Sequence, residues 1–268
     1  MKIILLSGGS GKRLWPLSND IRSKQFLKLL KNEEGESESM VQRVYRQIRD
    51  TGIEADLVIA TGKNQEDSIL SHLGDLIDIV LEPERRDTFP AIALASSYVF
   101  FEKNMDRDEA IVVLPVDPYA EIEYFETIKS LQELVESDKA KIGLMGIKPT
   151  YPSAKYGYIL TENGTGAVKG FQEKPSEALA EQLIADGAMW NGGVFAFKAG
   201  YIMDILASYI AFESFEDVRE QYSVLPKISF DYEVIENENS ISMVEYTGIW
   251  KDLGTWNTLT EVMDSHTV

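Results

Sequence analysis

The sequence contains no cysteine and only two histidines, His72 and His266, among its 268 residues. Without thiols, disulfide bonds, thiolate catalysis and cysteine-ligated zinc or iron are excluded. Two histidines are too few for a metal centre built from histidine ligands. The commonest cysteine-based and histidine-based sites are therefore ruled out.

Long hydrophobic runs and linkers are also missing. The first apolar run, Ile3 to Leu6, is far shorter than the core of a signal peptide, and no later stretch approaches the ~20 apolar residues of a membrane helix. We therefore expect a cytoplasmic protein that does not bind membranes. No Pro-rich, Gly-rich or Ser-rich linker marks a boundary, so one α/β domain is expected over residues 1–268. There is no run of hexapeptide repeats, and no left-handed β-helix domain is expected.

Positive charge is scarce and unevenly placed. The chain has 26 basic and 44 acidic residues, a net charge of −18, which argues against nucleic acid as a partner. The first 31 residues nevertheless carry seven basic residues and a single acid, Asp20. An acidic protein with this local excess is expected to bind a small, highly charged anion there. The other interpretation is a solvated basic face.

Apolar runs of strand length alternate with helical patterns, which predicts an α/β fold with a mixed, mostly parallel central sheet and helices on both faces. The expected strands are residues 57–61, 79–81, 111–116, 142–147, 168–171, 193–197 and 241–246. The expected helices are residues 40–49, 65–73, 90–103, 124–135, 176–186 and 256–262. Turn signals at Asn163-Gly164 and at residues 191–193 indicate that part of the sheet is antiparallel. Residues 33–39 are expected to form a flexible surface loop.

A glycine-rich segment, Ser7-Gly8-Gly9-Ser10-Gly11-Lys12-Arg13, follows the first apolar run directly. Glycines let the backbone turn successive N–H groups toward phosphate oxygens, and the two cations add positive charge. The segment is not a P-loop, because Lys12 is followed by Arg13 and the required earlier glycine is Leu6. It is not a dinucleotide fingerprint either, because Leu14 occupies the third glycine position.

Residues 6–17 together with residues 23–27 resemble the signature of sugar-1-phosphate nucleotidyltransferases, and most closely that of mannose-1-phosphate guanylyltransferases. The resemblance implies that Arg13 binds the phosphates of a nucleoside triphosphate and that Lys24 assists at the reacting phosphate. Ser23 replaces the proline that most relatives have before this lysine. The residues that the resemblance places around the nucleotide in this segment are Leu6, Ser7, Gly8, Gly9, Gly11 and Lys12.

Two aspartates are candidate metal ligands. Asp117 follows the buried strand at residues 111–116, where open α/β sheets place ligands, and Asp252 lies between a strand and a short helix. Mg²⁺ prefers a few carboxylates together with substrate phosphates and water, so two aspartates suffice. Similar aspartates coordinate Mg²⁺ in the family. Val116, Pro118 and Tyr119 depart from the family pattern around Asp117, and a capping role is the other interpretation of each aspartate.

The segment Glu82 to Ala95 resembles the base-binding segment of guanylyltransferases. The resemblance places Glu82, Arg86 and Thr88, with Pro115 from the strand at residues 111–116, around the nucleotide. Glu82 and Arg86 offer an acceptor and donors for a purine edge. Thr88 is also expected to cap the following helix, and Asp87 replaces the commoner asparagine.

Three further segments resemble the sugar-phosphate site of the family. In Phe171-Gln172-Glu173-Lys174-Pro175, Glu173 would accept hydrogen bonds from sugar hydroxyls and Lys174 would hold the sugar phosphate. The other sugar-side residues are Gly157, Asn191 and Gly193. Asp231, in a fourth matching segment, is expected either to contact ligand or to cap a helix.

The resemblance implies a Rossmann-like nucleotidyltransferase fold, with the nucleotide part at about residues 1–120 and the sugar-phosphate part at about residues 121–268. The implied reaction converts an NTP and a sugar 1-phosphate, GTP and mannose 1-phosphate in particular, to an NDP-sugar and pyrophosphate. Two alternatives stay open: a nucleotidyltransferase for another NTP or another sugar or polyol phosphate, and an inactive regulatory homologue that binds an NDP-sugar. A homodimer is plausible for the family.

Overall fold

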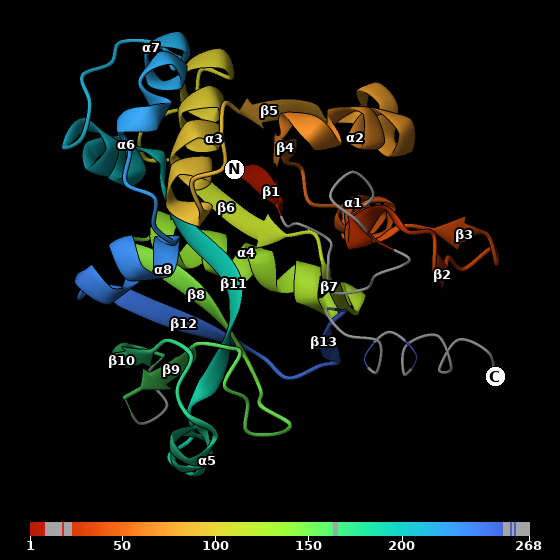
Figure 1. Ribbon diagram of the computed structural model, residues 1–268. Helices are drawn as coiled ribbons and strands as arrows, with labels where there is room; N and C mark the ends of the chain where they lie inside the picture. Colours follow the sequence, from red (N-terminus) through yellow and green to blue (C-terminus); the bar gives the residue numbers. More distant parts are fainter. Residues whose placement is uncertain (9–17, 19–22, 163–165, 254–257, 259, 261–268) are drawn as a thin grey trace.

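The computed structural model describes residues 1–8, 18, 23–162, 166–253, 258 and 260. A nine-stranded sheet crosses the molecule, with the order β10-β9-β11-β6-β1-β4-β5 and with β8 and β12 attached through β11 (Figure 1). These strands are β1 (Lys2–Ser7), β4 (Asp56–Gly62), β5 (Asp78–Glu82), β6 (Ala110–Pro115), β8 (Ile142–Ile147), β9 (Tyr158–Thr161), β10 (Val168–Gln172), β11 (Met189–Lys198) and β12 (Ile241–Tyr246). The expected mixed, mostly parallel sheet is confirmed.

The first half of the sheet is parallel. Strand β1 lies between β4 and β6, so that Leu5 has Ile59 on one side and Leu114 on the other. Its apolar run is buried on both faces, with Ile3 and Leu5 in one hydrophobic core and Ile4 in the other. Because the strands are parallel, their carboxyl ends meet at one edge of the sheet.

Strand β11 organises the second half and is antiparallel to β6, β8 and β9. The expected turn at residues 191–193 is wrong, because these residues lie inside β11. Gly193 has a φ of +70°, and the pairing with β8 shifts between Asn191 and Phe195, which is a bulge. The Asn-Gly-Gly signal therefore marks a bend within a strand rather than a hairpin. The hairpin signal at residues 163–164 lies outside the described residues, although β9 and β10 on either side of it are antiparallel.

Helices cover both faces of the sheet, as expected. One hydrophobic core contains residues of α1 (Met40–Asp50), α2 (Glu66–Leu73), α4 (Ile122–Glu136) and α5 (Glu177–Ala185). The other contains residues of α3 (Thr88–Glu102), α6 (Ala199–Ala207), α7 (Phe215–Glu220) and α8 (Phe230–Glu233). Short 3₁₀ turns are η2 (Lys24–Phe26), η3 (Lys63–Gln65), η4 (Gly74–Leu76), η5 (Tyr222–Val224) and η6 (Ile235–Asn237). Most of the helix expected at residues 256–262 lies outside the described residues. None of the described helices is long and apolar enough to span a bilayer.

Two small antiparallel sheets complete the fold. They pair β2 (Leu30–Lys31) with β3 (Ser37–Glu38), and β7 (Pro118–Ala120) with β13 (Trp250–Asp252). The expectation of a flexible loop over residues 33–39 is wrong at its end, because Glu38 is buried in β3 and Ser39 caps α1. An acidic, apolar-poor stretch is ordered here because Glu38 pairs with Arg43 and Arg46 of α1.

Candidate active site

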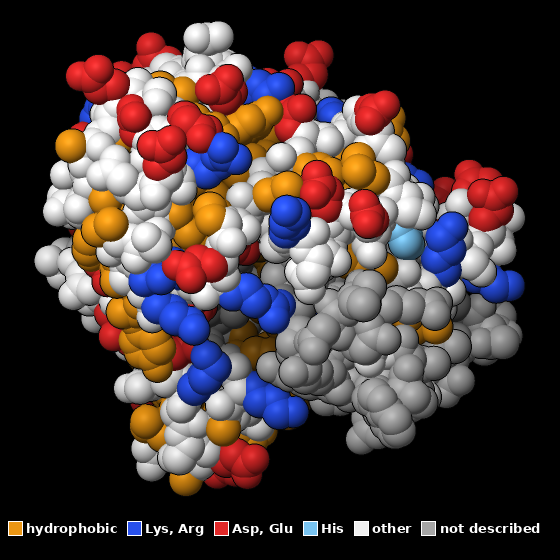
Figure 2. All heavy atoms as spheres, turned by 45° about the horizontal axis from the view of Figure 1, so that its top comes forward, with side chains coloured by type: hydrophobic (Ala, Val, Ile, Leu, Met, Phe, Trp, Pro, Cys, Tyr) orange, Lys and Arg blue, Asp and Glu red, His pale blue; other side chains and the backbone are white. Residues whose placement is uncertain are grey.

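The carboxyl ends of β1, β4, β5 and β6 surround a cavity of about 430 Å³. On the face that Figure 2 presents, Lys and Arg side chains gather around a hollow, although the protein as a whole is acidic. Several residues expected to bind nucleotide are brought together here. Those that line the cavity are Leu6, Gly8, Glu82, Arg86, Thr88, Pro115 and Asp117.

Lys24 lies between the two candidate metal ligands. Its Nζ is 2.9 Å from Oδ2 of Asp117 and 2.9 Å from Oδ1 of Asp252. Burial by itself lowers the pKa of Lys24, but the attraction of the two carboxylates outweighs it, so that this pKa lies above its ordinary value. The group is therefore an ammonium at neutral pH. Asp117 and Asp252 are 135 positions apart in the sequence but converge on one cation.

The two carboxylates converge because β7 and β13 are paired. Asp117 directly precedes β7, and Asp252 ends β13 opposite Pro118 in the antiparallel register (Figure 1). Asp117 is not the N-cap residue of a described helix. Most of the helix that Asp252 would cap lies outside the described residues, so a capping role of Asp252 stays a prediction.

A buried network of polar side chains fixes the segment that carries Lys24. The Gln25 amide donates to Ser7 Oγ and to Gln65 Oε1, each at 3.2 Å, and the Gln65 amide donates to Ser23 Oγ at 2.9 Å. The single hydroxyl hydrogen of Thr61 has two acceptors within reach, the carbonyl of Ser7 at 3.0 Å and Gln65 Oε1 at 3.1 Å. Ser23, the residue that replaces the usual proline, thus takes part in this network.

The network also changes the interpretation of Ser7 and adds residues that sequence reasoning missed. Ser7 is fully buried, so its side chain supports the site from beneath and does not face the cavity. Gln65 and Thr61 have no motif of their own. Their only sequence signal is a polar residue placed where a strand ends, which is too common to select them.

Glu82 lies at the end of β5, and Tyr222 from η5 donates its hydroxyl to Glu82 Oε2 at 2.9 Å. Burial raises the pKa of Glu82, which the Tyr222 hydrogen bond and Arg85 oppose. Tyr222 is itself buried. One oxygen of Glu82 is therefore held from behind by a residue 140 positions away, which no local sequence pattern indicates.

The start of α3 corrects one expectation. Thr88 does not cap the helix; the cap is Asp87, whose side chain accepts from the Thr88 N–H at 2.8 Å. Asp87 has a φ of +74° and a ψ of −175°, a region of backbone space that is occupied almost only by glycine. Thr88 instead accepts from the backbone N–H of Phe230. Arg86 donates to the carbonyl of Leu225 and pairs with Glu84, and so is held at the cavity wall.

The sugar-side residues are also brought together. The Asn191 N–H donates to the Gly157 carbonyl at 2.8 Å. A Cβ on Gly157 would lie 2.6 Å from Glu173 Oε2, so only glycine lets this carboxylate approach the backbone. Gly193 packs toward Pro115, which lines the nucleotide-side cavity. Lys174 pairs with Glu173 and is itself exposed.

Asp231 is not the helix cap, a role that belongs to Ser229 at the start of α8. It accepts instead from the Asn191 side-chain amide at 2.6 Å, while the Asn191 carbonyl oxygen accepts from the Gly193 N–H. Burial, with the nearby charge of Glu173, raises the pKa of Asp231 to about 6. The amide of Asn191 is thus locked in one orientation.

Aromatic rings join the sugar side to the two aspartates. The ring of Tyr156 lies 4.9 Å from that of Trp190 and 5.4 Å from that of Trp250, two residues before Asp252. Burial is the main reason that the pKa of Tyr156 is raised, and the charge of Asp252 adds to it. Gly9, Gly11, Lys12 and Arg13 lie outside the described residues, and their roles stay predictions.

The donor set fits a hard divalent cation. Two carboxylates already share a positive charge, and carboxylate oxygens are the ligands that Mg²⁺ prefers. No group of three or more His, Asp or Glu side chains in the described part of the chain is arranged to hold a metal. Asp117 and Asp252 would therefore need oxygen ligands from substrate or water to complete a magnesium site.

The open sheet, the cavity at its carboxyl edge and the paired aspartates define the α/β nucleotidyltransferase fold. The family model described as "Nucleotidyl transferase" matches residues 2–267. A crystal structure from Thermus thermophilus, described as a "mannose-1-phosphate geranyltransferase", has a TM-score of 0.80 and 30% identity, and the match covers 97% of this chain and 78% of that one. The chain belongs to the nucleotidyl transferase family.

Curated relatives agree with this assignment. The Xanthan biosynthesis protein XanB of Xanthomonas campestris is 32% identical over 97% of this chain. The mannose-1-phosphate guanylyltransferase of Salmonella montevideo is 31% identical over 97% of this chain. The match covers 59% of each relative, so this chain corresponds to about three fifths of their length.

Proposed function

We propose that this chain transfers a nucleotidyl group from an NTP to a sugar 1-phosphate, giving an NDP-sugar and pyrophosphate. The observation that carries the proposal is the convergence of Lys24, Asp117 and Asp252 on one point. That point lies at the edge of the cavity that Glu82 lines and is linked through aromatic rings to the Gly157, Glu173 and Asn191 cluster. GTP and mannose 1-phosphate are the proposed pair.

The chemistry of Glu82 favours guanine. Guanine presents two adjacent donors, N1–H and the 2-amino group, whereas the Watson–Crick edge of adenine presents a donor beside an acceptor. A carboxylate accepts from two neighbouring donors, and Tyr222 holds only Oε2 of Glu82. The name of the Salmonella montevideo relative points to the same base and sugar.

The proposed reaction needs no protein nucleophile. A phosphate oxygen of the sugar 1-phosphate forms a bond to the α-phosphorus of the NTP while the bond to pyrophosphate breaks on the opposite side. Two anionic substrates repel each other, so catalysis rests on positioning and on positive charge. Lys24 supplies this charge at the aspartate pair and Lys174 on the sugar side, and Arg13 is proposed to bind the triphosphate.

Asp117 and Asp252 would hold Mg²⁺. When bound, Mg²⁺ would offset the charge of the triphosphate next to Lys24. Glu173 accepts hydrogen bonds from sugar hydroxyls, and the locked amide of Asn191 presents its remaining N–H to the sugar. Tyr156 and the two tryptophans exclude water from one wall of the site.

The test is a panel of substrates. Pyrophosphate release is measured with GTP, ATP, UTP and CTP against mannose 1-phosphate, glucose 1-phosphate and a polyol phosphate, with Mg²⁺ present. We expect the highest kcat/KM for GTP with mannose 1-phosphate. Preference for another pair would contradict the proposed substrates but leave the proposed nucleotidyl transfer standing. NDP-sugar binding without turnover on any pair would instead indicate a regulatory homologue.

A further inference from the structure

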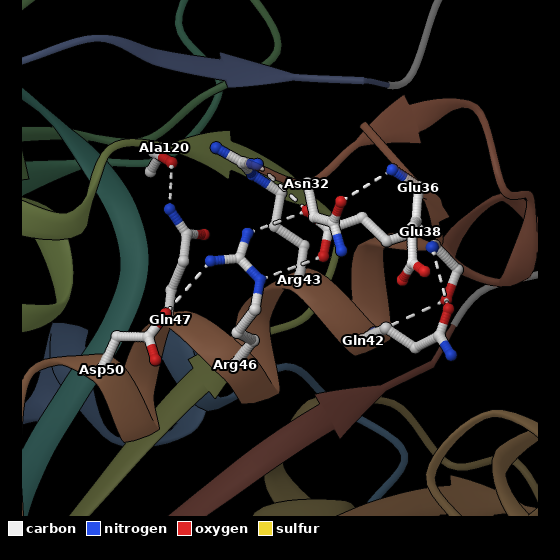
Figure 3. Close-up of polar contacts among 10 residues, drawn as sticks. Asn32, Glu36, Glu38, Gln42, Arg43, Arg46, Gln47, Asp50 and Ala120 are labelled. Atoms are coloured by element: carbon white, nitrogen blue, oxygen red, sulfur yellow. Dashed lines mark hydrogen bonds and ion pairs between the residues drawn. The ribbon is translucent and has the colours of Figure 1, made fainter. Parts of the chain in front are cut away.

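Helix α1 contacts the small sheet that carries the two aspartates. Figure 3 shows Gln47 of α1 directed at Ala120, whose carbonyl accepts from its side-chain amide at 3.1 Å, and this contact is buried. One turn earlier, the guanidinium of Arg43 lies over the Tyr119 ring at 4.9 Å. Both contacts reach β7, and neither touches a residue that lines the nucleotide-side cavity.

With its guanidinium over the Tyr119 ring, Arg43 leaves one of its donors without a hydrogen bond. Its Nη1 pairs with Glu38 Oε1 at 3.1 Å, but its Nε is buried without a hydrogen-bond partner. An unsatisfied buried donor is costly, and a guanidinium face over an aromatic ring is a recognised way to offset that cost. The guanidinium of Arg43 is therefore held by two contacts, one with the Tyr119 ring and one with the Glu38 carboxylate.

Strand β7 in turn decides where Asp252 lies. Asp117 lies in the short connection between β6 and β7, so the main sheet helps to place it. Asp252 lies on β13, which pairs with β7 and with no other described strand. The register places Lys251 opposite Tyr119 and Asp252 opposite Pro118. A shift of Tyr119 or Ala120 would therefore move Asp252 away from Lys24.

We infer that Arg43 and Gln47 are positioning residues that hold β7 and β13 so that Asp117 and Asp252 face each other. The inference rests on the proposed function in one respect: that Asp117 and Asp252 hold Mg²⁺. Pro118 and Tyr119, which depart from the family pattern, belong to the strand that pairs with the strand of Asp252. Tyr119 is buried, and its ring lies beneath the guanidinium of Arg43.

The chain offers a matched control. Arg46, one turn after Arg43, pairs with the same Glu38 through two nitrogens and also with Asp50 (Figure 3). Among the described residues, the cation–π contact with the Tyr119 ring is made by Arg43 and not by Arg46. Arg43→Met and Arg46→Met each remove one guanidinium from Glu38, but only Arg43→Met removes the contact with β7.

The first measurement is amide hydrogen exchange at Trp250, Lys251 and Asp252. We expect about tenfold faster exchange there in Arg43→Met, a change equal to the loss of a buried cation–π contact. Arg46→Met should stay close to wild type at these amides, and Arg43→Lys, which keeps a cation at the ring, should restore protection. Equal rates in Arg43→Met and Arg46→Met, or uniformly faster exchange across the chain, would overturn the inference.

The second measurement is Mn²⁺ binding, followed by electron paramagnetic resonance with the metal alone. We expect about fivefold weaker binding in Arg43→Met and little change in Arg46→Met. If wild-type protein binds no Mn²⁺, the metal assignment fails while the exchange result still decides the positioning role. If Arg43→Met does not fold, Tyr119→Leu removes the same contact from the other side and must give the same two results.

Discussion

Replacing Lys24 with methionine tests the centre of the site, because it removes the cation and keeps an unbranched side chain only one atom shorter. Both aspartate oxygens lie 2.9 Å from Nζ. The two carboxylates are thus no more than about 6 Å apart, and without Lys24 they repel each other by about 1 to 3 kcal/mol at effective dielectric constants between those of water and of a protein surface. Burial of the ammonium costs part of its attraction, so we expect the lower half of this range.

The expected result is a less stable protein that a divalent cation rescues. A loss of about 1 to 2 kcal/mol lowers the Tm of a domain of this size by roughly 2 to 8 °C. The pKa of Lys24 is raised above its ordinary value of 10.5, so its contribution is complete at neutral pH and is lost only as the pH rises above that value. We expect MgCl₂ at about 10 mM to recover about half of the lost Tm in Lys24→Met, because the freed carboxylates bind the cation.

Thermal unfolding near neutral pH with and without MgCl₂ is the assay, and Lys28→Met, at an exposed lysine on the same segment, is the control. The control should match wild type under both conditions. The reasoning is refuted if Lys24→Met is as stable as wild type without Mg²⁺. It is equally refuted if Mg²⁺ raises the Tm of Lys24→Met no more than that of the control.

Three further predictions follow from the same geometry. Asp252→Asn should leave the Tm within about 2 °C of wild type but reduce Mg²⁺-dependent pyrophosphate release at least about a hundredfold; near-normal activity would contradict the metal assignment. Tyr222→Phe removes only the hydroxyl that holds Glu82 and should lower kcat/KM for GTP about fivefold to thirtyfold, with Tyr209→Phe, from a tyrosine–glutamate pair outside the cavity, as the control that must not change. Asp231 has a pKa of about 6 against an ordinary 3.8, so wild-type stability falls as the pH rises between these values, by at most about 3 kcal/mol. Asp231→Asn should therefore have the higher Tm at about pH 8 and lose this advantage below about pH 4, where wild-type Asp231 is protonated in both states; a pH-independent difference in Tm would contradict the shift.

Most of the fold could be predicted from local patterns. Strands β8 and β12 have the expected ends, and α1 and α2 begin and end within one residue of expectation, because an apolar period follows directly from which face an element buries. The short strands β7 and β13 have no such period. They exist because they pair with each other, which no window of neighbouring residues reveals.

The wrong predictions, of a flexible loop and of two helix caps, also arose because neighbouring residues do not reveal which groups meet in the folded chain. The acidic neighbours of Glu38 predict a flexible loop, but two arginines of α1 hold Glu38 in place. Thr88 lies one position after Asp87, which caps α3, and Asp231 lies two positions after Ser229, which caps α8. A capping residue is selected by backbone dihedral angles, and several polar residues near a helix start satisfy the same sequence rule.

The sequence by itself determined the chemical groups: a glycine-rich segment with cations, two aspartates at the ends of strands, and a Glu-Lys pair beside glycine-containing strands. These follow from residue types and from their order along the chain, and the glycine-rich segment and Asp117 also follow the parallel strands β1 and β6, whose carboxyl ends share one edge. Only the tertiary structure decided which groups meet. The meeting of Lys24 with Asp117 and Asp252, the hold of Tyr222 on Glu82 and the contact of Arg43 with Tyr119 join positions 76 to 228 residues apart. Such contacts are set by how strands pair and helices pack, and no local pattern encodes them.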